Sequence, residues 1–429
     1  MRIVHVVPGS GNTFYCENCL RDTALVKAQR ALGHTVIMAP MYLPMFADEP
    51  GIAGDSPVFY GAISTYLAQE VPLLGRLPAW LLDTLNAPAL LKWAARKAGT
   101  TRASDLDEMT ISMLRGAEGR QARELERLIA WMITQAKPDV VHLSNALLLG
   151  LARRIRRDVG VPVVCSLQDE DTWIDAMSPK GARRAWDTMI GRAEDVALFT
   201  PVSEYYAGVM RERLRLPAGR MRTVYVGIDL EGHQPSPLRF DPPVIGYLSR
   251  MTESLGLGTL VEAFITLKQS PRLKDLRLRA TGGEIGGDAR FIARLRKRLA
   301  SLGMENDAAF LPAFDRPARL AFLQTISVMS VPMPRGEAFG MFQLEAMASG
   351  VPVVQPRAGA FPEIIGATGG GVAYEPNTVD GLAHALSSVL LDEENARALG
   401  SAGREAVFSS FSIERTAREL VSLYQALIH

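Results

Sequence analysis

The sequence predicts an α/β protein with two doubly wound, Rossmann-like domains that face a central cleft. The length of 429 residues exceeds one ordinary domain and suggests two. A β-branched run over residues 3–7 is followed by a glycine turn and a helical pattern, which together begin a βαβ unit. The same alternation of strands and helices restarts after a proline-rich segment at residues 231–243.

Each half of the chain supplies its own series of short apolar runs. In the first half we expect further strands at 35–39, 140–143, 161–166, 196–200 and 223–226. In the second half we expect strands at 244–248, 276–281, 309–311, 328–331 and 351–355, with helices at 257–267, 289–302, 316–325, 342–348 and 379–391. Such alternation is typical of parallel sheets covered by helices.

These elements predict three parts of the chain. Residues 1–235 form an N-terminal Rossmann-like domain on the acceptor side, and residues 236–410 form a second one that binds the donor ligand. Residues 411–429 form a helix, with Ser412 as its N-cap, that packs back toward the first domain. The pattern breaks at about 56–136, which we interpret as a helical insertion. Packing on the sheet, acceptor binding and a peripheral membrane contact stay open as its role.

Composition excludes several classes of function. Lys and Arg total 47 against 46 for Asp and Glu, so no overall positive charge favours nucleic acid. No run approaches the roughly 18–20 apolar residues of a membrane span. The start shows no signal-peptide pattern, and three cysteines make no disulfide framework, so we expect the cytoplasm. Cys16 and Cys19 share a CxxC spacing, but no second pair completes a metal site, and we predict no metal.

The most informative segment is RGEAFGMFQLEAMASGVPVV at residues 335–354. It predicts a loop, a helix and a strand, with Glu337 and Glu345 on either side of the helix start. The backbone N–H groups of residues 339–342 are then the unpaired donors of a helix N-terminus, which suits an anion or sugar oxygens. The segment therefore predicts a site for a ligand with phosphate or diol groups.

The spacing Glu337-x7-Glu345 resembles the donor motif of the family 4 retaining glycosyltransferases, which have the GT-B fold. The resemblance extends over most of residues 244–375. It implies that Glu337 contacts the transferred sugar and Glu345 the ribose of a nucleoside diphosphate sugar, with no cofactor required. It also implies a hydroxyl acceptor on a glycan, a lipid or a small molecule.

The resemblance assigns further donor contacts around the same segment. Arg250, at the end of a predicted strand, would bind the diphosphate and stabilise charge as the sugar–phosphate bond breaks. The remaining donor-binding residues that it implies are Gly282, Phe339, Gly340 and Met341. The family commonly carries a lysine five residues after this arginine, where this chain has Leu255. Arg335 is a candidate to replace that missing cation.

The first domain carries weaker signals. Gly9 and Gly11 allow the backbone to approach a phosphate closely. His142 ends a predicted strand and is a catalytic candidate, although Ser144 stands where the family often has a further histidine. Gln168 and Asp169 occupy the place of a frequent His-Asp pair and are candidates to contact a sugar.

Two other functions compete with hexosyl transfer to a hydroxyl. The same fold could serve a sugar-nucleotide epimerase or phosphorylase, because a fold does not determine a reaction. Leu255 and Ser144 also suit a degenerate protein that binds a sugar nucleotide without turning it over.

Overall fold

The computed structural model describes residues 1–8, 14–41, 107–217 and 219–428. The chain divides into two compact units. The first unit comprises Met1–Asn12, Asn18–Tyr225 and Thr416–His429, and the second comprises Thr13–Glu17 and Val226–Arg415. A short stretch near the N-terminus therefore belongs to the second unit, and most of the last helix belongs to the first.

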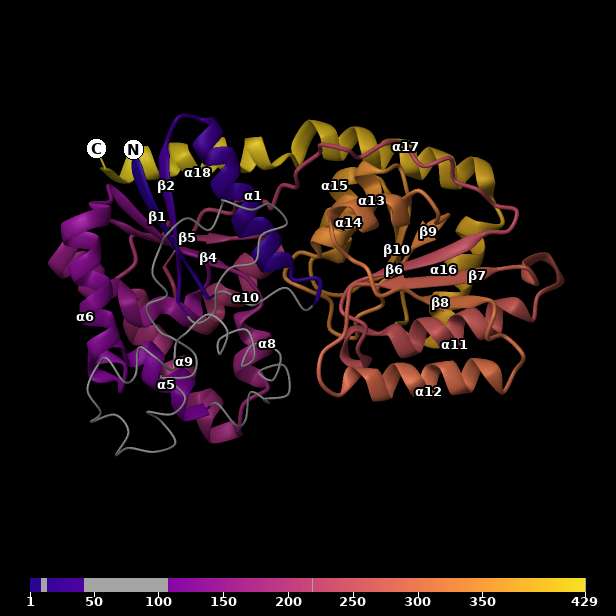
Figure 1. Cartoon of the computed structure of the whole chain (residues 1–429), viewed down its shortest axis with the longest axis horizontal. Coiled ribbons are helices and arrows are strands. Elements are labelled where there is room, and N and C mark those ends of the chain that lie inside the picture. Colours follow the sequence, from indigo (N-terminus) through magenta and orange to yellow (C-terminus); the bar gives the residue numbers. More distant parts are fainter. Residues whose placement is uncertain (9–13, 42–106, 218, 429) are drawn as a thin grey trace. The chain divides into compact units, whose positions relative to one another are not determined.

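The first unit contains one parallel sheet and its helices (Figure 1). Its strands are β1 (Arg2–Val7), β2 (Thr35–Pro40), β3 (Val140–Leu143), β4 (Val163–Leu167) and β5 (Leu198–Pro201). Its α-helices are α1 (Glu17–Ala31), α5 (Asp107–Arg115), α6 (Ala122–Trp131), α7 (Ala152–Arg154), α8 (Glu170–Asp175), α9 (Pro179–Ala193), α10 (Glu204–Leu214) and α18 (Ile413–Ile428). Short 3₁₀ or π turns are η3 (Gly116–Glu118), η4 (Met132–Ala136), η5 (Ala146–Leu151) and η6 (Ile155–Val159).

The second unit also contains one sheet. Its strands are β6 (Val244–Leu248), β7 (Arg277–Thr281), β8 (Ala308–Phe310), β9 (Val328–Met329), β10 (Val353–Pro356) and β11 (Gly371–Tyr374). Its α-helices are α11 (Leu257–Lys268), α12 (Asp288–Ala300), α13 (Arg316–Leu323), α14 (Met341–Ala348), α15 (Phe361–Thr368), α16 (Val379–Leu390) and α17 (Glu393–Ser410). Two 3₁₀ turns are η7 (Glu253–Leu255) and η8 (Pro271–Leu273).

Strand order fixes where a ligand site is expected in each unit. The first sheet runs β2-β1-β3-β4-β5 and the second β11-β10-β9-β6-β7-β8. All pairs between these described strands are parallel. In such sheets the chain reverses its winding at a switch point, and ligands bind beyond the carboxyl ends of the strands there. The switch points lie between β1 and β3 in the first unit and between β6 and β9 in the second.

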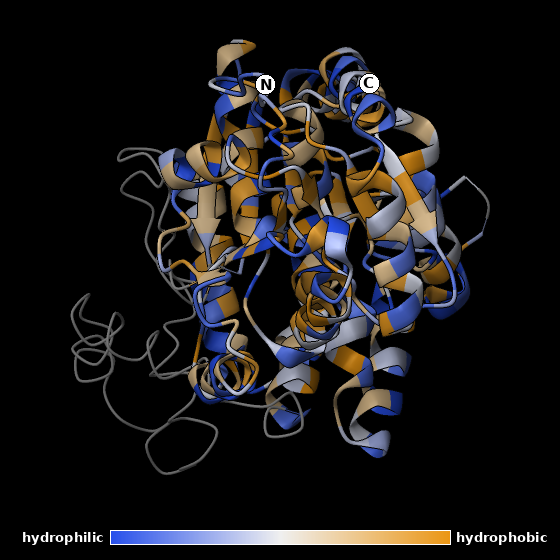
Figure 2. Ribbon diagram, turned by 90° about the vertical axis from the view of Figure 1, so that its right-hand side faces the viewer, coloured by the Kyte–Doolittle hydropathy of each residue, from blue (hydrophilic) through white to orange (hydrophobic). Residues whose placement is uncertain are grey.

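The strands are buried because helices cover the sheets. All five residues of β4 and all five of β6 are buried. Figure 2 shows the strands as predominantly hydrophobic. Helices α11 and α12 lie on one side of the second sheet, with α13 and α14 on the other (Figure 1). This is the composition expected for a parallel sheet with two covered faces.

Local sequence explains several helix starts. Ser178 and Asp315 each accept a hydrogen bond from a backbone N–H in the first turn, and a proline follows each of them within that turn. Thr378 caps α16 in the same way, by accepting from the N–H of Gly381. Side-chain caps of this kind satisfy donors that the helix itself cannot.

The predicted fold class, two doubly wound Rossmann-like domains, is confirmed by these two sheets. The cleft between the domains stays a prediction, as do the domain boundaries. Most of the predicted insertion, residues 56–106, lies outside the described residues; residues 107–136 form α5, η3, α6 and η4. Within the described ranges, every helix is too short or too polar to cross a bilayer.

Candidate functional site

The candidate site of the second unit lies at the switch point of its sheet. Arg250 follows β6 by two residues, and the loop that carries Glu337 joins β9 to α14. Because β6 and β9 are neighbouring parallel strands, both segments leave the same edge of the sheet. The sequence motif and the arginine are thus brought together by strand order.

A buried aspartate holds Arg250 in a fixed orientation. The Arg250 Nε donates to Asp288 Oδ2 at 2.7 Å and Nη2 donates to Oδ1 at 3.2 Å, which is a bidentate pair. Asp288 begins α12 and also accepts from the N–H of Ile285. The Arg250 guanidinium carbon lies 5.7 Å from the ring centroid of Phe14. Since 30% of the Arg250 side chain is exposed, the cation is oriented but accessible.

Close backbone packing determines the conformation of the Glu337 loop. Gly336 and Gly359 both have positive φ, at 69° and 59°. A Cβ on Gly359 would lie 2.5 Å from the backbone N and O of Glu337, so a side chain does not fit there. The N–H of Ala360 donates to the Glu337 carbonyl at 2.9 Å. The two loops therefore hold each other, and Glu337 with them.

The side chain of Glu337 lies near the end of β6. Burial raises the pKa of Tyr247 well above its usual value, and the negative charges of Glu337 and Asp288 add to that shift. The Tyr247 hydroxyl donates to the carbonyl of Arg250 at 2.9 Å. Tyr247 thus connects the arginine and the first glutamate of the motif within one unit.

Gly340 directly precedes helix α14, and its φ of 82° favours a residue without a side chain. Phe339 and Met341 flank it and are both buried. The carboxylate of Glu17 accepts hydrogen bonds from the N–H groups of Met341 at 2.7 Å and Phe342 at 3.3 Å. The N-terminus of α14 therefore binds an anionic group, here a side chain of the same chain.

Glu345, the second glutamate of the motif, is 6% exposed and is held by two side chains. Its Oε1 lies 3.3 Å from Nε of the buried Arg319, and its Oε2 accepts from the Tyr15 hydroxyl at 3.3 Å. The Arg319 guanidinium carbon lies 5.6 Å from the Tyr15 ring centroid. These contacts orient the Glu345 carboxylate inside the second unit.

Gly282 lies where the backbone after β7 approaches the backbone after β6. Its φ is 133°, and a Cβ there would lie 2.1 Å from the Ser249 carbonyl oxygen. The Gly282 carbonyl accepts from the N–H of Tyr15 at 2.8 Å. Gly282 therefore allows the close approach that brings Tyr15 toward Glu345.

The position of the missing lysine is also described. Leu255 ends the short turn η7 and is half-buried, and its carbonyl lies 3.5 Å from the Tyr247 hydroxyl. Arg335 is exposed and has no ion-pair partner among the residues that the structure describes. Arg335 is thus available as a second cation next to the motif.

His142 lies in the core of the first unit. It is 1% exposed; Nε2 lies 2.8 Å from Ser166 Oγ and Nδ1 lies 2.5 Å from the Tyr424 hydroxyl. Its ring stacks on His5 with centroids 4.7 Å apart. Burial lowers the pKa of His142 well below its usual value. Both ring nitrogens are engaged, and we leave His142 out of the proposed catalytic set.

The carboxyl ends of β3 and β4 carry a buried polar cluster instead. The Ser144 carbonyl accepts from Nη2 of Arg21 at 3.1 Å and from Nε2 of Gln168 at 2.8 Å. Arg21 also donates to the Gln168 side-chain oxygen and pairs with Asp22. Glu170 accepts from the N–H groups of Ala146 and Gln168, both at 2.7 Å. We call these residues the first-unit polar cluster: Arg21, Asp22, Ser144, Gln168 and Glu170.

The remaining predicted residues are two glycines, Asp169 and the cysteines. Gly9 and Gly11 lie outside the described residues. Asp169 has a left-handed φ of 55° and begins α8. The three cysteines form no disulfide, and Cys165 is buried in β4.

Four residues that contact this site were missed by sequence reasoning: Tyr15, Glu17, Asp288 and Arg319. Each lies far along the chain from the group it binds, for example 38 residues between Arg250 and Asp288. The only sequence signal was that Asp288 follows two glycines at a helix start. Long-range partners of this kind leave no periodic pattern.

A sheet of this order, with an oriented arginine, two glutamates and helix N–H groups at its switch point, is the arrangement at which doubly wound α/β proteins bind ligands. Two family models match the chain: "Glycosyl transferases group 1" over residues 231–406 and "Glycosyltransferase Family 4" over residues 110–231. The chain belongs to the family 4 glycosyltransferases, as its sequence motif predicted.

Two relatives are 28% and 27% identical to this chain over the residues that align. The GDP-mannose-dependent alpha-(1-6)-phosphatidylinositol monomannoside mannosyltransferase of Mycobacterium tuberculosis is 28% identical over 249 residues, covering 54% of this chain and 62% of the relative. The chain therefore spans less than two thirds of that relative's length. The MMP alpha-(1->4)-mannosyltransferase of Mycolicibacterium hassiacum is 27% identical over 303 residues, covering 68% and 71%.

Solved structures show the same fold. Sucrose-phosphate synthase from Thermosynechococcus elongatus matches with a TM-score of 0.73 at 19% identity, covering 100% of this chain and 99% of that one. Anabaena HepE in complex with UDP matches with a TM-score of 0.69 at 16% identity, covering 100% of both chains. These likenesses confirm the predicted GT-B fold class.

Proposed function

We propose that this protein transfers a sugar from a nucleoside diphosphate sugar to a hydroxyl acceptor with retention of the anomeric configuration. The observation that carries the proposal is the switch-point site of the second unit, where Arg250, Glu337, Glu345 and the N-terminus of α14 meet. It supplies positive charge for a diphosphate and carboxylates for hydroxyl groups, as a sugar nucleotide requires.

Each group has a separate part in binding the donor. Glu345 accepts hydrogen bonds from the two ribose hydroxyls, and Glu337 accepts from hydroxyls of the transferred sugar. Arg250 and the first N–H groups of α14 bind the diphosphate. Because Asp288 orients Arg250 beforehand, little reorganisation is needed when charge develops on the leaving group.

The transfer needs no protein nucleophile. The bond between the anomeric carbon and the phosphate oxygen breaks, and the acceptor hydroxyl oxygen bonds to the anomeric carbon from the same face. The acceptor proton passes to the leaving phosphate oxygen. The residues of the site position the reactants and stabilise the negative charge of the diphosphate, and no cofactor takes part.

The donor that we favour is a hexose nucleotide. The two relatives described above are mannosyltransferases by name, and one of them is named for GDP-mannose. The first of these names gives a phosphatidylinositol monomannoside as the acceptor, and we propose a polyhydroxylated acceptor, free or attached to a lipid. We also propose that the protein acts in the cytoplasm, where nucleotide sugars are available.

A second candidate is a protein that binds the sugar nucleotide without transferring the sugar. The observation that favours it is the uncharged, half-buried Leu255 in the place of the family lysine, together with the Asp288 carboxylate that already neutralises Arg250. One cation that is partly neutralised stabilises a leaving diphosphate less than two free ones. Donor binding without product distinguishes this candidate from the first.

The test is a panel of GDP-, UDP- and ADP-hexoses measured by thermal shift, followed by product analysis with candidate acceptors. A specific donor stabilises the protein in proportion to the logarithm of its concentration over its Kd, about 2.7 kcal/mol at 100 Kd. Glu345→Gln is the matched negative control, because it keeps the shape of the side chain. If no nucleotide sugar stabilises the wild-type protein, the proposal is wrong.

A further inference from the structure

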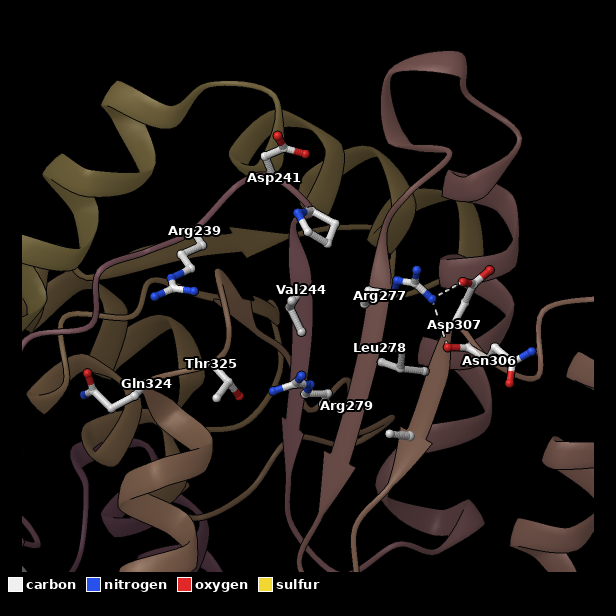
Figure 3. A pocket seen from close by; sticks show the side chains of 12 residues that line it. Arg239, Asp241, Val244, Arg277, Leu278, Arg279, Asn306, Asp307, Gln324 and Thr325 are labelled. Carbon is white, nitrogen blue, oxygen red and sulfur yellow. Dashed lines mark hydrogen bonds and ion pairs between the residues drawn. The ribbon is translucent and has the colours of Figure 1, made fainter.

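A pocket of about 560 Å³ lies at the opposite edge of the second sheet, near the starts of its strands (Figure 3). Strands β6, β7 and β8 begin beside it, at Val244, Arg277 and Ala308. The candidate donor site lies at the carboxyl ends of these same strands. The pocket is therefore separate from that site and has no part in the proposed transfer.

The pocket forms because the sheet face is incompletely covered there. Strand register pairs Val244 with Arg277 and Gly246 with Arg279, so these four positions share one face. Ile326 packs over Gly246, since a Cβ on that glycine would lie 2.5 Å from the Ile326 side chain. Helix α13 ends at Leu323 and does not cover the start of β7. The two arginines of β7, Arg277 and Arg279, therefore stay partly exposed.

The positive charges of this pocket are only partly compensated. Arg277 forms an ion pair with Asp307, and Lys268 Nζ also lies 2.6 Å from Asp307 Oδ2. Arg239 and Arg279 line the same pocket, and within the described ranges neither guanidinium has a hydrogen-bond or ion-pair partner. Arg239 is exposed and Arg279 is half-buried, so both guanidiniums are accessible to a ligand. Two such cations in one pocket repel each other and attract an anion.

The side chains of Arg277 and Arg279 point in different directions (Figure 3). Arg277 turns toward Asp307 at the β8 side, whereas the side chain of Arg279 extends from β7 across β6 toward Thr325. Asp241 lies at the exposed upper edge of the view and forms no ion pair with another described residue. The uncompensated positive charge therefore lies on the side of the pocket formed by Arg239, Arg279 and Thr325.

We propose that this pocket binds a phosphate monoester, with Arg239 and Arg279 as the phosphate ligands. A guanidinium donates two parallel hydrogen bonds to phosphate oxygens, and two guanidiniums match the charge of a dianion. Asn306, Gln324 and Thr325 supply polar groups for the hydroxyls of the attached alcohol. The volume lies in the range of small-molecule sites and suits a phosphorylated sugar or polyol, free or as a lipid headgroup.

The experiment is a titration of the full-length protein with a hexose 6-phosphate and with inorganic phosphate at constant ionic strength, followed by calorimetry. We expect saturable binding to the wild-type protein and a loss of affinity of tenfold or more in the double variant Arg239→Ala/Arg279→Ala, since charged hydrogen bonds are lost. Arg279→Gln alone should lose about half of that effect on a logarithmic scale. Unfolding midpoints of all variants verify that they fold.

A matched control removes the same charge elsewhere. Arg183 and Arg418 are exposed, lie on helices α9 and α18 of the first unit, and have no ion-pair partner among the described residues. Arg183→Ala/Arg418→Ala should bind the phosphate esters as the wild type does. Equal weakening in the control and the pocket variant, or unchanged binding in the pocket variant, would overturn the proposal.

Two further measurements separate the sources of the phosphate and the two sites. Phosphatidylcholine vesicles with and without phosphatidylinositol phosphate test the headgroup: binding that depends on Arg239 and Arg279 assigns the pocket to a lipid, and binding of the soluble ester alone assigns it to a free metabolite. Nucleoside diphosphate affinity should be unchanged in the pocket variant. Loss of donor binding together with phosphate binding would contradict a separate site.

Discussion

The carboxyl ends of the two sheets are built from similar side chains but are used differently. In the first unit, Arg21, Gln168 and Glu170 are at most 6% exposed and bind one another or nearby backbone groups. In the second unit, Arg250 is oriented by one aspartate and keeps 30% of its side chain exposed. A closed polar cluster fixes loops, whereas an oriented and accessible cation can bind a ligand.

The second unit also has a helix N-terminus at its switch point that binds an anionic group. The N-terminus of α14 presents two N–H groups to the Glu17 carboxylate. A diphosphate that binds there replaces one anion with another. The second unit therefore has groups that a ligand can contact or replace, whereas the polar side chains of the first unit bind one another. Four predictions test this difference.

The largest expected effect is on turnover. Arg250→Ala should lower kcat by roughly 10²–10³-fold, the typical cost of one preorganised charge-stabilising donor. Arg250→Lys should recover only part, because an ammonium cannot replace the bidentate fork or the pairing with both Asp288 oxygens. Steady-state kinetics with the donor that the thermal-shift panel identifies measure both. Arg21→Lys, which changes the buried arginine of the first unit, should lower stability without this specific loss of kcat.

Two further variants test which cations bind the diphosphate. Leu255→Lys restores the family cation and should tighten nucleoside diphosphate binding. Arg335→Ala should weaken that binding if the exposed arginine serves as the second cation. Full activity in Arg250→Ala would mean that the leaving group is bound elsewhere.

The second prediction concerns the pH dependence of stability in the first unit. Burial lowers the pKa of His5 from 6.5 to about 4, so the folded protein binds fewer protons than the unfolded chain between these values. The free energy of unfolding should then fall as the pH drops from 6.5 to 4, by about 3 kcal/mol from His5. Denaturant titrations of wild type and His5→Gln across this window should show that the variant lacks this contribution.

Glu170 should change the free energy of unfolding with pH in the opposite direction to His5. Burial raises its pKa from 4.5 to about 7, so the folded protein binds more protons between these values and loses stability as the pH rises through them. Glu170→Gln should therefore make the acid-side loss steeper, whereas His5→Gln makes it shallower. Identical slopes in the two variants would contradict the assignment of both groups.

The third prediction concerns the ribose. Glu345→Gln should weaken nucleotide binding by about 1–3 kcal/mol, the value of a hydrogen bond to a charged group. It should also lower the unfolding midpoint, because it removes a negative charge that lies next to the buried Arg319. Tyr15→Phe removes one hydrogen bond to Glu345 and keeps the charge, so it should cost less in both measurements. Calorimetry that shows unchanged nucleotide affinity in Glu345→Gln would remove Glu345 from the site.

The smallest expected effect concerns Glu17. If its carboxylate occupies the N–H groups that a diphosphate uses, Glu17→Gln should tighten nucleoside diphosphate binding by roughly two- to fivefold, the scale of one charge at a helix N-terminus. The control is Glu414→Gln, which removes an exposed glutamate from the first turn of α18. Weaker binding in Glu17→Gln would show that this carboxylate supports donor binding instead of competing with it.

Some features were predictable because they are local in the sequence. The alternation of apolar runs and helical patterns predicted every strand of the two sheets except β11, although the strand expected at 223–226 does not form. The helix expected at 342–348 begins within one residue of the start of α14. The motif at residues 335–354 predicted the family because its two glutamates and glycine lie within ten residues of one another. Patterns of this kind depend on helical and strand periodicity, which the sequence carries directly.

Other features depended on groups that are far apart along the chain. His142 lies near the end of a strand, as expected, yet its Nδ1 bonds to the hydroxyl of Tyr424 in the last helix, 282 residues away. Asp288, Tyr15 and Arg319 reach the site only because strand order and close glycine packing bring their segments together. No local pattern encodes which side chain will face another across a sheet edge.

The sequence by itself determined the α/β class, the family and the position of the donor motif, because backbone preferences and burial act over a few residues. Tertiary structure decided which charges are satisfied and which remain accessible. Arg250 and Arg279 both lie on or next to parallel strands of one sheet, but one is oriented by Asp288 and the other has no described partner. The energy of a charge depends on its surroundings in space, and those surroundings form only when the chain folds.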